Sequence, residues 1–222
     1  AMIVEPWFDQ VGAILLAWYP GQEGGHAIAR LLFGEANPSG KLPVSFPRAE
    51  SELPQFDNQS PQVRYDGLHG YGFLARHDIP ARYAFGHGLS YTEFTYGAAK
   101  QSETSIPTAC SPCRWPAEPV VQFTVDITNS GSVAGAEVVQ LYSIPPAADS
   151  AWPKRALKTY QRVFLAAGDS RTVTLSLTLR DLARFDPQSG RWRVDAGQYV
   201  VHVGSSSTDV RHHFTLAVEE QK

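Results

Sequence analysis

Polar and apolar residues alternate with a period of two along much of the second half of the chain. The clearest run is residues 121–128, where apolar side chains occupy the odd positions and polar side chains the even ones. Similar spacing recurs in residues 139–141, 173–179, 199–203 and 214–218. Turn residues such as Asn129-Ser130-Gly131 separate these runs. Short alternating strands predict a β-sandwich, and about 100 residues is the size of one immunoglobulin-like domain.

The first part of the chain has a different pattern. Residues 13–18 are apolar without alternation, which is typical of a strand covered on both faces of a parallel sheet. Pro20 and Gly21 end this run, and Ile28, Leu31 and Leu32 then recur at helical spacing. Gly34 stands where a glycine often ends a helix. The pattern predicts a strand, a loop and a helix of an α/β sheet, with the loop 21–25 at the strand end where ligands gather.

These patterns divide the chain into three regions. We expect residues 1–100 to be an α/β region with a long aromatic loop, 101–118 to be a linker, and 119–222 to be the β-sandwich. The predicted fold class is therefore α/β plus all-β. Residues 47–100 carry few periodic elements, and so long an irregular segment usually has a function or wraps another surface.

Composition excludes some classes of function. The formal net charge is −3, so there is no electrostatic footprint for nucleic acid or an anionic membrane. The longest apolar stretch, 11–19, is about half of the roughly 18 residues that a membrane helix needs. Cys110 and Cys113 could form a redox pair or half a zinc site, but without a second pair a small disulfide loop or two free thiols is the simpler interpretation. A disulfide would favour an exported protein.

Three carboxylates are candidates for chemistry or for ligand binding. Glu23 lies on the loop at the predicted strand end, beside aromatic residues that could raise the pKa of an acid/base carboxyl. Alternatively, Glu23 caps the following helix or pairs at a domain interface, which we favour. Asp57 and Asp66, in the long irregular segment, could contact the hydroxyls of a ligand, although loop carboxylates are mostly solvated.

The irregular segment is also rich in aromatic side chains, which could stack on the rings of a ligand. The alternative, which we favour, is that they anchor a segment without regular structure, since each aromatic side chain buries roughly 150–250 Å². They are Phe46, Phe56, Tyr65, Tyr71, Phe73, Tyr83, Phe85, Tyr91, Phe94 and Tyr96.

Other patterns are weaker. Residues 34–41 are one residue too long for a phosphate-binding loop. Ser90 near His87 lacks the Gly-x-Ser-x-Gly elbow of a hydrolase, so His87 is expected to fix a glycine turn by hydrogen bonding. His212 and His213 are adjacent on a predicted strand and point to opposite faces, so they cannot chelate one metal together. We expect no metal and no cofactor.

Several motifs, in this order, resemble one enzyme family. They are Ala17-Trp18-Tyr19-Pro20-Gly21-Gln22-Glu23-Gly24-Gly25, Asn37-Pro38-Ser39-Gly40-Lys41-Leu42-Pro43, Phe85-Gly86-His87-Gly88-Leu89-Ser90-Tyr91 and Glu137-Val138-Val139-Gln140-Leu141-Tyr142. Together they resemble the C-terminal part of family 3 glycoside hydrolases of the β-glucosidase and β-xylosidase type, ending in a fibronectin type III-like module. One departure is Tyr65-Asp66-Gly67 followed by Gly72, where family members often have Tyr-x-Glu-Gly and an arginine.

The resemblance implies a retaining β-glycosidase, most simply a β-glucosidase, which needs a nucleophile and an acid/base carboxyl roughly 5–5.5 Å apart. The family's aspartate nucleophile and acid/base glutamate are expected from an N-terminal barrel and an earlier loop of the α/β domain. Neither motif occurs in these 222 residues, so we expect no catalytic residue here and no activity from this chain alone.

The partners implied by the resemblance are the N-terminal barrel and the first part of the α/β domain of the same enzyme. The substrate would be a β-linked oligosaccharide or an aryl glycoside, with the substrate-binding residues unknown. Because a disulfide between Cys110 and Cys113 would favour an exported protein, we expect a periplasmic or secreted location. The alternative is a non-catalytic sugar-binding or interaction module.

Overall fold

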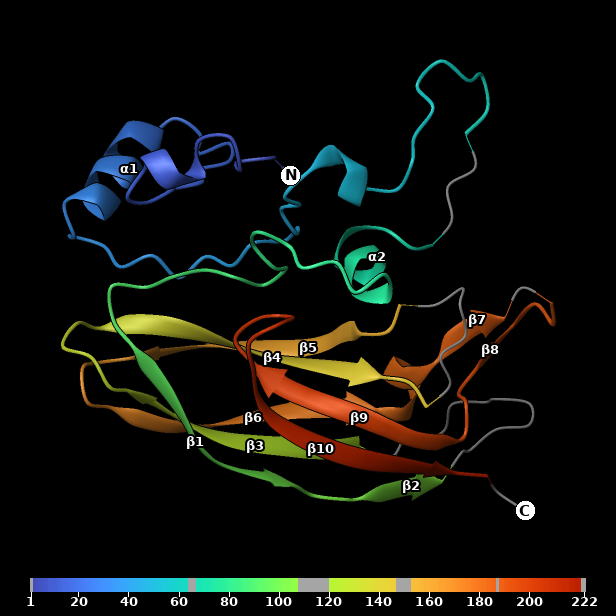
Figure 1. Cartoon of the computed structure of the whole chain (residues 1–222). Helices are drawn as coiled ribbons and strands as arrows, with labels where there is room; N and C mark the ends of the chain where they lie inside the picture. Colours follow the sequence, from blue (N-terminus) through green and yellow to red (C-terminus); the bar gives the residue numbers. More distant parts are fainter. Residues whose placement is uncertain (1, 64–66, 108–119, 147–152, 187, 221–222) are drawn as a thin grey trace.

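The computed structural model describes residues 2–63, 67–107, 120–146, 153–186 and 188–220. Residues before β1 lie along one side of a β-sandwich that the later residues form (Figure 1). The helices of this first part are the 3₁₀ helix η1 (Phe8–Gln10), α1 (Gly24–Leu32), the 3₁₀ helix η2 (Glu50–Glu52) and α2 (Gly70–Arg76). No helix of the described residues is long and apolar enough to cross a membrane.

The β-sandwich has two main sheets in the described residues. Its elements are β1 (Phe94–Gln101), β2 (Ser105–Pro107), β3 (Val120–Asn129), β4 (Gly135–Ile144), β5 (Ala156–Leu165), β6 (Ser170–Thr178), the 3₁₀ helix η3 (Leu179–Leu182), β7 (Arg184–Asp186), β8 (Arg191–Arg193), β9 (Gly197–Gly204) and β10 (Val210–Glu219). One sheet has the order β1-β3-β6 and the other β2-β10-β9-β4-β5, while β7 and β8 form a separate hairpin. β2 runs parallel to β10, and the other pairs are antiparallel.

The alternating runs of the sequence form strands, as expected. In β3, the apolar side chains from Val121 to Ile127 are at most 2% exposed, while Gln122 between them faces solvent. The matching positions of β4, β6, β9 and β10 complete one core cluster between the sheets. The turn predicted after β3 is also present, because the Asn129 side chain accepts a hydrogen bond from the Gly131 backbone at 3.2 Å.

The sheets begin earlier in the chain than the sequence pattern indicated. β1 pairs with β3 from Phe94 to Gln101, and β2 pairs with β10, so residues 94–107 belong to the sandwich and not to a linker. The sequence of β1 lacks a regular alternation of polar and apolar residues, because its pairing with β3 shifts in register between Tyr96 and Ala99. The rest of the predicted linker, with Cys110 and Cys113, lies outside the described residues.

The helix predicted in the first part is confirmed, but the strand before it is not. α1 ends at Leu32, and Gly34 adopts a left-handed φ of +76°. Residues 13–18, by contrast, belong to none of the sheets of the described residues. Because a strand needs neighbours to pair with its backbone groups, this run stays irregular, and Leu15 is 44% and Trp18 52% exposed.

Candidate functional site

The loop before α1 places its carboxylate in solvent. Glu23 is the N-cap residue of α1, where its backbone carbonyl accepts a hydrogen bond from Ala27 at 2.9 Å. Its side chain makes no capping bond and instead lies 2.8 Å from His26 Nδ1, with 82% of the side chain exposed. In the described residues the Glu23 side chain therefore neither caps the helix nor pairs at a domain interface, contrary to our expectation, but pairs with a neighbour on the surface.

Two motifs that lie far apart in the sequence come side by side next to the sandwich. The backbone of Leu42 donates to His87 at 2.8 Å, and Gly86 donates to Leu42 at 2.8 Å. Gly88 lies so close to Gly40 that an added Cβ would come within 2.2 Å of the Gly40 carbonyl oxygen. The glycine turn at residues 86–88 is therefore fixed by backbone hydrogen bonds to residues 40–42 and by close packing.

His87 takes part in this turn through its backbone carbonyl, which accepts from Leu42, and its ring makes a separate contact. Its ring stacks on Tyr83 at 5.3 Å, and burial lowers the pKa of His87 with a further contribution from Lys41. Ser90 Oγ donates to Asn37 at 2.9 Å. Neither side chain is arranged as part of a nucleophile–base pair.

Asn37 links this turn to the sandwich. Its side-chain oxygen accepts from Ser90 Oγ and from the Tyr91 backbone, and its amide nitrogen donates to the Ala134 carbonyl at 3.0 Å. Asn129, which is fully buried, accepts from Thr92 Oγ1 at 2.6 Å in the same region. Two buried or half-buried amides thus connect the end of the long irregular segment to the turn between β3 and β4.

Gln140 on β4 is the polar centre of this contact. It is 3% exposed, its amide nitrogen donates to the carbonyls of Gly86 and Ser205, and its oxygen accepts from Tyr142 Oη at 2.6 Å. Gly86 adopts a φ of +82°, and a Cβ there would come within 2.2 Å of the Gln140 side-chain oxygen. Only glycine satisfies both the backbone angle and the space at this position.

A buried ion pair lies at the end of the same strand. Lys41 Nζ lies 3.0 Å from a Glu137 carboxylate oxygen, with only 15% and 9% of the two side chains exposed. Lys41 also donates to the Gly88 carbonyl at 3.0 Å, and Glu137 accepts from the Val138 backbone. Each of these buried charges is therefore compensated by a partner from the other half of the structure.

The aromatic side chains of the irregular segment are largely packing residues, as favoured from the sequence. Tyr71 on α2 stacks on Phe85 at 4.5 Å and makes an edge contact with Tyr142 at 6.3 Å. Its hydroxyl accepts from the Leu157 backbone at 2.9 Å. Phe46 and Tyr83 likewise contact each other, at 6.0 Å. These contacts hold α2 against the outer face of β4 and β5.

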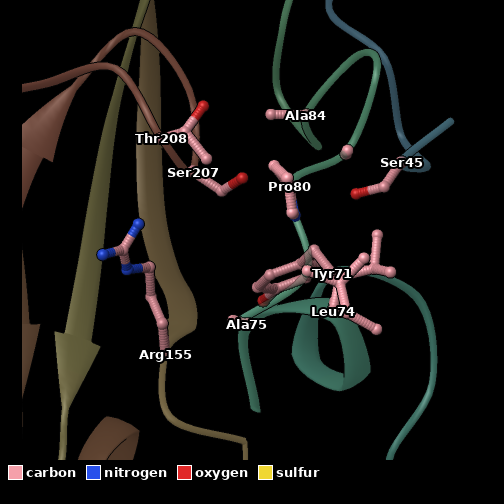
Figure 2. Close-up of a pocket in the computed structure, with 11 residues that line it drawn as sticks. Ser45, Tyr71, Leu74, Ala75, Pro80, Ala84, Arg155, Ser207 and Thr208 are labelled. Atoms are coloured by element: carbon pink, nitrogen blue, oxygen red, sulfur yellow. The ribbon is translucent and has the colours of Figure 1, made fainter. Parts of the chain in front are cut away.

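A cavity of about 80 Å³ lies between α2 and the sandwich. Figure 2 shows Tyr71 and Leu74 of α2 on one side, Arg155 at the start of β5 on the other, and Ser207 and Thr208 of the loop after β9 above it. Its lining residues include no Asp or Glu. The cavity therefore has no carboxyl that could act as a glycosidase acid or nucleophile.

The predicted sugar contacts and the altered motif are only partly described. Asp57 is exposed and accepts from the Gln59 backbone at 2.9 Å, as in a local turn, while Tyr65 and Asp66 lie outside the described residues. Gly72, in place of the family's arginine, is buried, and an added Cβ would lie 3.2 Å from Pro153. Space is thus a physical reason for a small residue there.

The histidine pair on β10 is split between the two faces of the strand. His213 contacts His202 of β9 at 4.5 Å, and His212 contacts Phe214 at 6.4 Å. No cluster of metal-ligating side chains occurs in the described ranges. The contact between His213 and His202 had no signal in the sequence because it depends on the pairing of β9 with β10.

The fold and these contacts define a class of protein in which the end of an α/β domain is fixed onto an immunoglobulin-like sandwich by glycine turns and buried polar pairs. Comparison with family models agrees, since residues 1–91 match the glycosyl hydrolase family 3 C-terminal domain and 137–207 match the fibronectin type III-like domain. The chain belongs to glycoside hydrolase family 3, as a C-terminal part with a fibronectin type III-like domain.

Relatives and solved structures extend this similarity across the chain. The chain is 35% identical to beta-glucosidase B of Emericella nidulans over 99% of its length and 26% of that protein, and 39% identical to a beta-glucosidase of Rhizobium radiobacter over 93% and 25%. The crystal structure of a beta-D-glucoside glucohydrolase from Trichoderma reesei matches with a TM-score of 0.87 and 34% identity, over 98% of this chain and 32% of that one. Beta-glucosidase 3B of Thermotoga neapolitana, solved in complex with glucose, matches with a TM-score of 0.83 and 35% identity, over 98% and 30%. The chain thus spans about a quarter of the length of these curated relatives.

Proposed function

We propose that this chain is the C-terminal portion of a retaining β-glycosidase, most simply a β-glucosidase that releases terminal β-linked sugars. The observation that carries the proposal is the similarity to beta-glucosidases over nearly the whole chain, at 35–39% identity in the two relatives above. Relatives also include an exo-alpha-(1->6)-L-arabinopyranosidase of Bifidobacterium longum at 35% identity.

We infer further that the nucleophile and the acid/base carboxyl belong to the N-terminal barrel and the earlier part of the α/β domain of the same enzyme. Two features support this. Glu23 is exposed and the described cavity has no acidic lining residue, so neither offers a desolvated carboxyl pair. In addition, the relatives are about four times as long as the match.

The surface of the first part of the chain suits such a partner. Large apolar side chains are exposed there: Val11, Leu15, Trp18, Tyr19, Leu32 and Phe33. Tyr19 is 99% and Phe33 85% exposed, which is unusual for side chains of this size in a stable monomer. We expect the rest of the α/β domain to cover this surface, and the chain alone to self-associate.

Complementation tests this function. The chain and the N-terminal part, produced separately, should be inactive alone and should hydrolyse p-nitrophenyl β-glucoside when mixed. Phe33→Asp should weaken the restored activity at least tenfold, whereas Tyr160→Asp, at an equally large exposed residue on β5, should leave it within about twofold. Two folded pieces that bind each other without restoring hydrolysis, or a chain that turns over the glycoside by itself, would refute the proposal.

The alternative of a non-catalytic sugar-binding module predicts a different result. The isolated chain would then bind glucose or cellobiose measurably, and calorimetry without heat at millimolar sugar would remove that alternative. Within the enzyme, we propose that the sandwich braces the segment 37–91, through the buried contacts of Gln140, Asn129 and the Lys41–Glu137 pair.

For the location of the enzyme, we infer a periplasmic or secreted protein. The support is the spacing of Cys110 and Cys113, which suits a small disulfide loop, and disulfides persist in oxidising compartments. Two titratable thiols in protein isolated without reductant would remove this argument.

A further inference from the structure

The cavity between α2 and the sandwich is lined by a cation, Arg155, whose Nε has no hydrogen-bond partner among the described residues. Arg155 lines the cavity, its Nε is buried, and no hydrogen-bond acceptor reaches that nitrogen. The neighbouring Lys154, by contrast, lies 2.8 Å from Asp78. Among the described residues, the Asp78 carboxylate therefore pairs with Lys154.

An unpaired guanidinium in a partly buried site is unfavourable, because arginine stays charged in proteins and loses hydration on burial. The surroundings of Arg155 do not compensate for its charge. The cavity lining has no carboxylate, and the adjacent His202 has a pKa lowered to about 4 by burial, with contributions from Arg155 and His213. His202 is therefore neutral at pH 7 and adds neither a counter-charge nor a second cation.

The remaining polar groups of the cavity can all donate hydrogen bonds. The residues Ser45, Ser207 and Thr208 line it together with Tyr71. The Tyr71 hydroxyl accepts from the Leu157 backbone, and its O–H group can still donate a hydrogen bond. In Figure 2 these groups come from both sides of the cavity, α2 and its flanking loops on one side and the sandwich on the other. Hydroxyl donors around one guanidinium are complementary to an oxyanion.

The size of the cavity agrees with a small ligand. Its volume of about 80 Å³ is larger than the roughly 30 Å³ that one water molecule occupies in the liquid. It is far below the several hundred Å³ of a pocket for a drug-sized molecule or a disaccharide. The apolar walls, such as Leu74 and Ile79, would exclude water from around a bound anion and strengthen its pairing with Arg155.

We propose that this cavity is a binding site for a small oxyanion, inorganic phosphate or a free carboxylate such as acetate, held by Arg155 and by hydroxyls from both halves of the structure. The anion bridges α2 and the β-sandwich and stabilises their contact. The site is separate from the sugar chemistry proposed above and does not depend on it.

Calorimetry and thermal unfolding test the proposal on protein that carries the full 222-residue chain. Sodium phosphate, and sodium acetate in a separate arm, are compared with sodium chloride at matched ionic strength, so that screening does not imitate binding. We expect saturable heat and a raised Tm with at least one oxyanion. Arg155→Gln should weaken the binding at least tenfold, whereas Arg162→Gln, at an exposed arginine of β5, should leave it unchanged.

Two results would overturn the proposal: no saturable response of the wild-type protein to either oxyanion, or the same response in Arg155→Gln. If Arg155→Gln fails to fold, a wild-type crystal soaked in selenate decides, because selenium scatters anomalously. An anomalous peak beside the Arg155 guanidinium supports the site, and a cavity without such a peak refutes it.

Discussion

Glycine is required at position 86, where the first part of the chain packs on the β-sandwich, for two reasons: its backbone angle and the space available. The variant Gly86→Ala, compared with a matched control, separates them. Gly86 has a φ of +82°, which strains any residue with a Cβ, and its Cβ would come within 2.2 Å of the Gln140 side-chain oxygen. Gly168, in the turn between β5 and β6, has nearly the same φ, +79°, but no atom within 4 Å of an added Cβ. Gly168→Ala therefore measures the backbone strain alone.

The expected difference follows from the contacts of Gln140. Left-handed backbone costs alanine about 1–2 kcal/mol, partly offset by about 0.4–1 kcal/mol from the stiffer unfolded chain, in both variants. In Gly86→Ala the Gln140 amide must also move, which disturbs its bonds to Gly86, Ser205 and Tyr142. Each buried group left unpaired costs about 1–3 kcal/mol, so we expect an additional loss of about 3 kcal/mol after partial relaxation.

Urea unfolding followed by tryptophan fluorescence gives the free energy of unfolding of the two variants under identical conditions. Gly86→Ala should lose about 3 kcal/mol more than Gly168→Ala, with the same dependence on urea concentration if both remain fully folded. Equal losses in the two variants would refute the reasoning, because the Gln140 contact would then contribute nothing at this position.

Two further predictions concern buried ionisable side chains. Lys41→Met should destabilise the protein by about 3–5 kcal/mol because it leaves the Glu137 carboxylate buried without its partner, and Lys41→Met combined with Glu137→Leu should recover most of the loss in urea unfolding; a double variant as unstable as the single one would contradict this. His202 has a pKa lowered from 6.5 to about 4, so the unfolded chain binds its proton first and stability falls as the pH drops from about 6.5 to 4, by at most about 3 kcal/mol. His202→Phe should lose less stability over that window than the wild-type protein, and parallel pH profiles would count against the assignment.

Local patterns in the sequence predicted the elements whose partners lie within the chain. The period of two in residues 121–128 predicted β3, because one face of that strand is buried and the other is not. The helical spacing and Gly34 predicted α1 and its end. The same kind of reasoning gave a strand at 13–18 that the structure does not have, since apolarity alone does not supply a neighbouring strand.

The candidate site could be predicted only as a set of motifs. The sequence marked residues 37–43, 85–91 and 137–142 as parts of one family pattern, yet gave no reason why Lys41 meets Glu137 or why Gly86 must lack a side chain. Arg155 had no signal at all, because its importance comes from the cavity it lines and from the acceptor it lacks.

The sequence by itself determined the alternating strands, the first helix and the family, because these depend on side-chain periodicity and on residues close together along the chain. The tertiary structure decided where β1 and β2 pair, which polar groups are buried and which cation is left without a counter-charge. The physical reason is that burial and electrostatic pairing depend on segments that meet only after the chain has folded, and their distances are not encoded in any local pattern.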